Sequence, residues 1–364
     1  MNHMFSPTAG AIGIDVGEAT VRAVQVRWRG GRAHLAAGLA WPLRTPGTFA
    51  QEDAGAFAEA LHRSGFQGRD VIAFAPHRSL LTTTMELPPR TSAAPIRQLA
   101  RVEMARIHRL EVNSFELGMW DTPTPDRRPG ATHAIVTALP TQAGEAMASL
   151  FADAGLRLLC LDTQMCALAR VCDRAVSAVP SLVGVVKVGW SGCRVMLMHV
   201  GGPDGVLPVY ERVVEEVSLA ALTKCVEEKL GLSREGVQLA LCSSAEDVAA
   251  DAPSRDLLRH ARAFQGEFLD RLVTETQRSF SYAVQMYPTL PMTTVLVTGE
   301  GHRVRGLKER IANTLGLDAR DLVPSDAAVA QEGSTLGADG SLVPALGLAM
   351  LPAAVAVPTA RRAA

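Results

Sequence analysis

Two glycine turns, each predicted to follow an apolar strand, carry the residues of this sequence that are best suited to chemistry. The first turn places Asp15 two residues before Gly17. Such a glycine lets backbone N–H groups approach phosphate oxygens, and the aspartate can hold a hydrated Mg²⁺ ion nearby. Asp-x-Gly is also an ordinary turn, so the motif gains its weight from a second copy. In that copy Lys187 stands two residues before Gly189.

A third turn has two glycines, Gly299 and Gly301, and follows a predicted apolar strand at Val295–Thr298. Closely spaced glycines between a strand and a helix allow a flat ligand to pack on the backbone. Upstream, a predicted helix at Glu267–Met286 carries three polar residues within about one helical turn. These are Glu275, Arg278 and Ser279. A solvated helix face is the ordinary explanation of such a trio.

The elements that must position these turns occur twice in the same order. Hydrophobic periodicity first predicts three strands, a helix and a fourth strand, at Ala11–Val16, Val21–Trp28, Ala33–Ala40, Glu52–Arg63 and Val71–Ala75. Three strands and a helix recur at Leu182–Val188, Cys193–Val200, Val206–Val213 and Ser218–Leu230. An offset of 172 residues superposes Gly17 on Gly189 and Arg22 on Arg194. An internal duplication is therefore predicted.

Between the repeats lies a segment of different character, about Leu80–Leu159. A helix at Pro95–Leu110 places apolar residues on one side and arginines elsewhere. Two strands are predicted next, at Phe115–Trp120 and His133–Leu139. A second helix is predicted to follow Thr141 as its N-cap and to run to Ala154. The pattern indicates a small α/β insertion within the first repeat.

The composition restricts the class of protein. The 364 residues are 48% hydrophobic with a net charge of −1, which excludes dominant disorder and gives no overall attraction to nucleic acid or anionic lipid. The most apolar window, Leu342–Pro358, contains prolines and falls short of the roughly 20 residues of a membrane span. It predicts a core helix followed by a loose tail. Without a visible secretory signal, and with six cysteines at no metal-ligand spacing, we expect a cytoplasmic protein with buried thiols.

Taken in order, these motifs resemble the actin-like ATPase superfamily, in particular the PilM family of type IV pilus assembly. Residues 13–17, followed by Val21 and Arg22, are similar to the family's first phosphate loop. Residues 275–282 are similar to its adenosine-side helix, and residues 298–301 to its adenosine glycine turn. The resemblance covers roughly residues 11–350. It implies an α/β, actin-like (duplicated RNase H-like) fold, with two halves around a nucleotide cleft and a small insertion in the first half.

The resemblance also implies a division of the chain and a set of binding residues. The first half would comprise residues 1–79 and a return helix at 160–176, the inserted α/β subdomain 80–159, the second half 177–352, and a flexible tail 353–364. ATP with Mg²⁺, where bound, would contact Asp15, Gly17, Thr20, Lys187, Gly189, Glu275, Arg278, Ser279, Gly299 and Gly301. Asp15 would be the metal ligand.

Three positions depart from the family's pattern. Lys187 stands where an aspartate is usual, and Glu18 and Glu300 stand where small residues are usual. A carboxylate facing a triphosphate costs on the order of 1 kcal/mol or more per nearby negative charge. Lys187 either pairs with Asp15 across the cleft, so that no nucleotide binds, or neutralises the phosphate of a bound nucleotide. Both outcomes disfavour hydrolysis, so we expect no catalytic residue.

The leading hypothesis is therefore a scaffold. The resemblance implies a cytoplasmic protein, peripheral to the inner membrane, that binds the N-terminal peptide of a bitopic PilN-like pilus-assembly protein in a groove formed by the first half and its insertion. Two alternatives stay open, an ATPase or sugar kinase of the same fold and a filament-forming division-type protein. Binding to nucleic acid is not expected, and homo-oligomerisation stays open. His302 is interpreted as a surface histidine.

Overall fold

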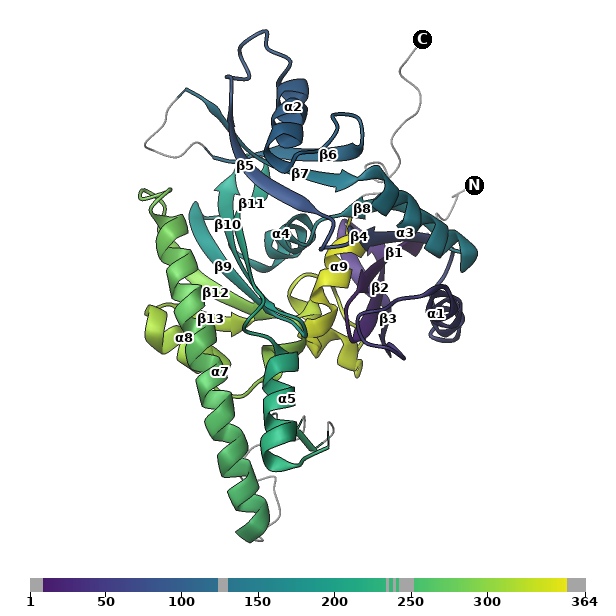
Figure 1. Cartoon of the computed structure of the whole chain (residues 1–364), viewed down its shortest axis with the longest axis vertical. Coiled ribbons are helices and arrows are strands. Elements are labelled where there is room, and N and C mark those ends of the chain that lie inside the picture. The colour runs from purple at the N-terminus through teal and green to yellow at the C-terminus, as the bar shows by residue number, and fades with distance from the viewer. Residues whose placement is uncertain (1–8, 124–129, 234–235, 238–239, 242–251, 352–364) are drawn as a thin grey trace.

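The computed structural model describes residues 9–123, 130–233, 236–237, 240–241 and 252–351. They form two five-stranded sheets with helices beside them, and a three-stranded sheet at one end of the molecule (Figure 1). The expected tail at 353–364, residues 124–129 between two of the predicted strands, and Cys242 lie outside the described residues. Within the described ranges, no helix is both long and apolar enough to cross a bilayer.

The first sheet has the strand order β3-β2-β1-β4-β8. Its first three strands form an antiparallel meander, and β4 and β8 continue the sheet in parallel. The strands are β1 (Ala9–Val16), β2 (Thr20–Arg29), β3 (Arg32–Pro42), β4 (Asp70–Phe74) and β8 (Arg157–Asp162), and α1 (Gln51–Arg63) connects β3 to β4. The buried, largely apolar runs of β1, β2 and β4 place this sheet in the interior.

The second sheet repeats this topology with the order β11-β10-β9-β12-β13. Its strands are β9 (Ser181–Val188), β10 (Cys193–Gly202), β11 (Gly205–Val214), β12 (Met292–Thr298) and β13 (Asp318–Asp321). The pairing register agrees with the predicted offset. Asp15 lies opposite Arg22 in the first sheet, and Lys187 lies opposite Arg194 in the second. The predicted duplication is therefore confirmed.

The insertion is built on the three-stranded sheet, in the order β5-β7-β6. Its elements are β5 (Leu81–Leu87), α2 (Ile96–His108), β6 (Phe115–Asp121) and β7 (Thr132–Pro140), followed by α3 (Thr141–Asp153). Apolar residues of α2, among them Ile96, Ala100 and Met104, pack on one face of this sheet. α3 and β8 lie within the expected insertion 80–159 but contact the first half, since α3 packs on α1 and β8 extends the first sheet.

Two buried helices lie between the sheets, α4 (Gln164–Ala175) and α9 (Val343–Ala349). α9 confirms the core helix expected in the apolar window near the C-terminus. The backbones approach so closely that a Cβ atom on Gly13 of β1 would lie 2.1 Å from Ala345 O of α9. A Cβ atom on Gly347 would lie 2.2 Å from Ala167 O of α4. Glycine is required at both crossings because any side chain would overlap a backbone atom.

The remaining helices belong to the second half. α5 (Leu219–Leu230) and α7 (Ala252–Val284) extend together beyond the sheet, and α8 (Leu307–Leu315) packs beside α7 (Figure 1). α7 has 33 residues, so it is ~50 Å long at a rise of 1.5 Å per residue. Four short 3₁₀ helices complete the half: η1 (Glu300–Arg303), η2 (Pro324–Asp326), η3 (Thr335–Ala338) and η4 (Gly340–Leu342).

Some expectations about local structure need correction. Thr141 is the first residue of α3 and not its N-cap, since the preceding Pro140 takes the cap position without a side-chain hydrogen bond. The helix predicted at Glu267–Met286 is the C-terminal part of the much longer α7. Three strands, β5, β8 and β13, were not predicted. The thiols of Cys172 and Cys193 are buried as expected, whereas Cys160, Cys166 and Cys225 are only half-buried.

Candidate functional site at the cleft between the halves

A cavity of about 270 Å³ lies between the two sheets, where β1 and β9 end. The turn after β1 borders it from the first half, and the turns after β9 and β12 border it from the second half. Five of the ten predicted binding residues line the cavity: Asp15, Gly17, Lys187, Gly189 and Gly299. The other five lie away from its lining: Thr20, Glu275, Arg278, Ser279 and Gly301. The structure therefore brings together the three glycine turns but not the polar residues of α7.

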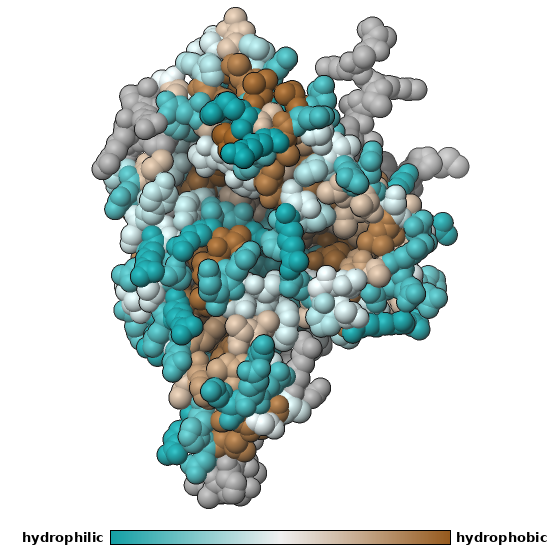
Figure 2. Space-filling view, in the orientation of Figure 1, coloured by the Kyte–Doolittle hydropathy of each residue, from teal (hydrophilic) through white to brown (hydrophobic). Residues whose placement is uncertain are grey.

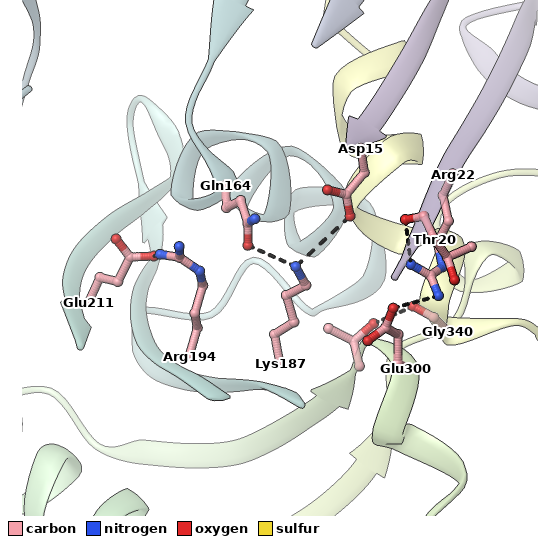
Figure 3. A network of polar contacts seen from close by, with 10 residues as sticks. Asp15, Thr20, Arg22, Gln164, Lys187, Arg194, Glu211, Glu300 and Gly340 are labelled. Atoms are coloured by element: carbon pink, nitrogen blue, oxygen red, sulfur yellow. Dashed lines mark hydrogen bonds and ion pairs between the residues drawn. The ribbon is translucent and has the colours of Figure 1, made fainter. Parts of the chain in front are cut away.

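An ion pair between equivalent positions of the two halves lies in this cleft (Figure 3). Lys187 Nζ is 3.9 Å from Asp15 Oδ2 and donates a hydrogen bond to Gln164 Oε1 at 3.0 Å. The two charged side chains are 15% and 7% exposed. Because the duplication relates the two positions, a second aspartate here would face the first, and two close carboxylates cannot both ionise without a compensating cation. The Lys187 ammonium supplies that cation from within the chain.

Burial and neighbouring charges act in opposite directions on Lys187. Burial lowers the pKa of its ammonium group, the nearby Asp15 carboxylate raises this pKa, and Arg194 lowers it further. Burial is the largest of these effects, so the folded protein binds the lysine proton less tightly than the unfolded chain does. The contribution of Lys187 to stability therefore rises as the pH rises toward the ordinary lysine pKa of 10.5.

A second ion pair crosses the same cleft, between Arg22 of β2 and Glu300 of η1 (Figure 3). Arg22 Nη2 lies 2.7 Å from Glu300 Oε1, and the side chains are 9% and 17% exposed. Arg22 is notable in the sequence because the repeat offset superposes it on Arg194, and Glu300 because it departs from the family's pattern. Neither observation predicted the contact between Arg22 and Glu300, because the two residues lie in different halves and no sequence motif contains both of them.

Other charged groups at the cavity are paired as well. Arg78 Nη2 donates to Glu18 Oε1 at 3.1 Å, and Arg194 Nη1 donates to Glu211 Oε1 at 2.9 Å. The lining contains four carboxylates and four cationic side chains: Asp15, Glu18, Glu215 and Glu300 with Arg22, Arg78, Lys187 and Arg194. Burial lowers the pKa of His77 in the same lining, which favours its neutral form. A triphosphate would therefore meet no net positive charge here.

The glycine turns use their amide groups for their own structure. Gly17 N–H donates to Thr20 O at 3.2 Å, and Gly189 N–H donates to Gly192 O at 3.1 Å. A Cβ atom would lie 2.7 Å from Thr20 O at the first turn and 2.8 Å from Gly192 O at the second. The tight turns themselves therefore require glycine. Thr20, predicted as a phosphate contact, accepts hydrogen bonds through its carbonyl within the turn.

The polar residues of α7 form a salt-bridged helix surface. Glu275 Oε2 lies 2.7 Å from Arg212 Nη2 of β11 in an ion pair, and Glu275 Oε1 accepts a hydrogen bond from Arg278 Nη1 at 2.6 Å. Ser279 Oγ donates to the Glu275 carbonyl at 2.8 Å, within the helix. The three predicted residues therefore interact with one another and with β11. The ordinary explanation, a solvated helix face, describes Arg278 but not the other two, because Ser279 is 1% exposed and the Glu275 side chain 18%.

The third glycine turn packs directly on β9. A Cβ atom on Gly301 would lie 2.3 Å from Val188 Cγ1. The interpretation of His302 as a surface residue was wrong, because this histidine is buried. Its Nδ1 lies 2.8 Å from Gly299 O, and its Nε2 accepts a hydrogen bond from the Gly340 N–H at 3.3 Å. His302 thus joins the glycine turn to η4 and has a structural role.

Charged groups of the expected nucleotide site already contact one another. Asp15, the expected metal ligand, already lies beside Lys187, and within the described ranges no group of three His, Cys, Asp or Glu side chains could hold a metal ion. Glu300, Glu18 and Asp15 each lie beside a cationic side chain. The arrangement positions opposite charges across the cleft, with a lysine at the position that the duplication relates to Asp15.

Two sheets of one topology around a cleft, with buried helices between them, define an actin-like fold. Comparison with solved structures agrees with this class. A chain of the PilM-PilN type IV pilus biogenesis complex is similar at a TM-score of 0.71 and 19% identity, covering 94% of this chain and 98% of that chain. Ethanolamine utilization protein EutJ from Carboxydothermus hydrogenoformans is similar at 0.50 and 14%, covering 96% and 91%. No family model and no curated protein matches the chain.

Proposed function

We propose that this protein is a PilM-like scaffold of a type IV pilus or related secretion complex, with a degenerate nucleotide site. In this role it would lie at the cytoplasmic face of the inner membrane and bind the N-terminal peptide of a bitopic PilN-like protein. The similarity to a chain of the PilM-PilN complex, nearly complete in both chains, supports the assembly. The observation that favours a scaffold over an ATPase is the pair formed by Lys187 and Asp15 in the cleft.

The proposal also accounts for the other departures from the family's pattern. Each substituted charge has an opposite charge beside it: Lys187 lies near Asp15, Glu300 contacts Arg22, and Glu18 contacts Arg78. In a site that binds Mg-ATP, the phosphates and the metal would supply such partners. Here side chains supply them. We expect such pairing of opposite charges in a cleft that has kept its shape but does not hydrolyse nucleotide.

The insertion offers the surface on which a partner peptide would lie. α2 buries Ile96, Ala100 and Met104 against its own sheet but leaves Leu99, Val102 and Ile107 exposed. Hydrophobic and hydrophilic residues lie side by side at this end of the molecule (Figure 2). Beside α2, a groove is lined by Arg97, Arg101 and Val112 among others. Aliphatic side chains next to arginines suit a peptide that carries apolar and acidic residues.

Titration with Mg-ATP tests the degenerate site. We expect weak or no binding by calorimetry and no release of phosphate above the rate without protein, because Asp15, the expected metal ligand, already lies beside Lys187. The protein should behave in the same way with Mg-ADP. Robust hydrolysis that is lost in Asp15→Ala would overturn the proposal and favour an active ATPase.

A binding experiment tests the partner surface. We expect Val102→Asp to weaken binding of the N-terminal peptide of a candidate PilN-like protein by at least about tenfold, because it places a charge in an apolar contact. Val179→Asp is the matched control, since Val179 is also exposed but lies next to β9 in the second half. Isothermal titration calorimetry measures both. Equal affinities of the two variants would show that α2 is not the peptide site.

A further inference from the structure

Side chains of both halves meet at the base of the cleft. Lys187 of β9 reaches Asp15 of β1 and Gln164 of α4, so one residue of the second half contacts two elements of the first. Arg22 of β2 reaches Glu300 of η1, which joins the halves a second time (Figure 3). Each of these contacts would be broken if the two sheets moved apart.

The insertion adds two contacts between the halves. Trp120 of β6 donates a hydrogen bond from Nε1 to Pro208 O of β11 at 2.9 Å. Thr122, just after β6, forms a side-chain hydrogen bond with Tyr287, just after α7, and both residues are buried. The halves are therefore joined at the base of the cleft and also through the insertion. Of the contacts described here, the two ion pairs, Lys187–Asp15 and Arg22–Glu300, lie at the base of the cleft.

The Arg22–Glu300 pair makes only part of the contact that its groups allow. An arginine and a carboxylate can form two parallel hydrogen bonds. Among the residues that the structure describes, Arg22 Nε and Glu300 Oε2 are buried without a hydrogen-bond partner. Both residues line the cavity, so an open cleft would let water reach these atoms. Opening of the cleft therefore restores hydrogen bonds with water to these two atoms, which lack them in the closed form.

We propose that Arg22–Glu300 and Lys187–Asp15 form a latch that holds the two halves closed through the chain's own side chains, without a bound ligand. Removing one member of a buried pair leaves the other charge uncompensated in the closed form, and this shifts the balance toward an open cleft. Arg22–Glu300 is the closer of the two pairs, at 2.7 Å against 3.9 Å, so its removal is the sharper test of the latch. The latch is a conformational device in addition to the scaffold role, and it does not depend on which partner is bound.

Hydrogen–deuterium exchange of the full chain, with small-angle X-ray scattering, tests the latch. Glu300→Gln preserves the shape of the side chain but removes its charge. We expect exchange of the Leu35 and Val329 amides, which form backbone hydrogen bonds between β3 and the second half, to become about tenfold faster, because losing a buried contact between charged groups shifts an equilibrium by at least about that factor. The radius of gyration should increase. Arg22→Glu combined with Glu300→Arg should restore slow exchange and the original radius.

Asp70→Asn is the matched control. It removes the Asp70–Arg157 pair, in which Arg157 Nε lies 2.6 Å from Asp70 Oδ1 and which joins β4 to β8 within the first sheet. This variant should leave exchange at Leu35 and Val329 unchanged. Unchanged exchange and scattering in Glu300→Gln would overturn the latch. So would an equal acceleration of exchange in all parts of the chain, since that is the behaviour of a contact with a purely structural role.

Discussion

Replacing Lys187 with alanine is expected to lower the free energy of unfolding by about 3 kcal/mol, at the lower end of the range for breaking a buried ion pair. Asp15 would remain buried without its ion-pair partner, and Gln164 would lose its donor. The lower end applies because Nζ and Oδ2 are 3.9 Å apart, farther than a direct hydrogen bond. Urea unfolding, followed by circular dichroism, measures the effect.

Two further variants separate the ion pair from other causes. Asp15→Asn combined with Lys187→Met removes both charges and should recover most of the lost stability, because uncharged side chains of similar size often replace a buried pair without loss. Arg106→Ala breaks the exposed Arg106–Glu103 pair of α2 and should change stability little. A Lys187→Ala protein as stable as the original would contradict a buried pair at this position.

Gly13→Ala is expected to have the second large effect on the free energy of unfolding. A Cβ atom at this position would lie 2.1 Å from Ala345 O and 2.5 Å from Ala349 N, and both are backbone atoms of α9 that cannot rotate away. β1 and α9 would have to separate, which opens the core between the sheets. Overpacking commonly costs about 1–3 kcal/mol and occasionally more, and we expect at least the upper value here. Thermal unfolding and the yield of soluble protein report it.

Gly55→Ala is the same kind of substitution, but we expect it to raise the stability of the protein. Gly55 lies inside α1, and a Cβ atom there would meet no atom within 4 Å. Alanine in a helix interior is favoured over glycine by roughly 0.5–1 kcal/mol, so this variant should be slightly more stable than the original protein. If Gly13→Ala had an equally small effect, the close crossing of β1 and α9 would be wrong.

Most of the architecture could be predicted from the sequence, because it depends on repeated local patterns. Apolar alternation predicted β1, β2 and β3, and the repeat offset predicted the same order in the second half. The strands that were missed have weaker patterns. β13 consists of Asp318–Asp321, two of whose four residues are acidic, and it is a strand only because it pairs with β12. Such an element depends on tertiary pairing and not on its own propensity.

The candidate site was predictable only in part. The duplication identified Asp15 and Lys187 as equivalent positions, and their pairing was one of two outcomes deduced from charge. The contacts of Arg22 with Glu300 and of Trp120 with Pro208 could not be deduced, since each joins segments far apart in the chain. His302 was misplaced for the same reason: its burial depends on Gly340 of a distant 3₁₀ helix. Sequence patterns identify the turns but not what packs over them.

The position of α9 has a consequence for how the protein is made. This helix, at Val343–Ala349, packs against β1, β2, β4 and α4, and Arg170 of α4 donates from Nε to Gly347 O at 2.8 Å. β1, β2 and β4 thus complete their packing with a helix that the ribosome synthesises long after these strands. While the chain still grows on the ribosome, the first half has an unfilled apolar face. Its folding cannot finish until about residue 350 has emerged, so chaperones have a long period in which to act on it.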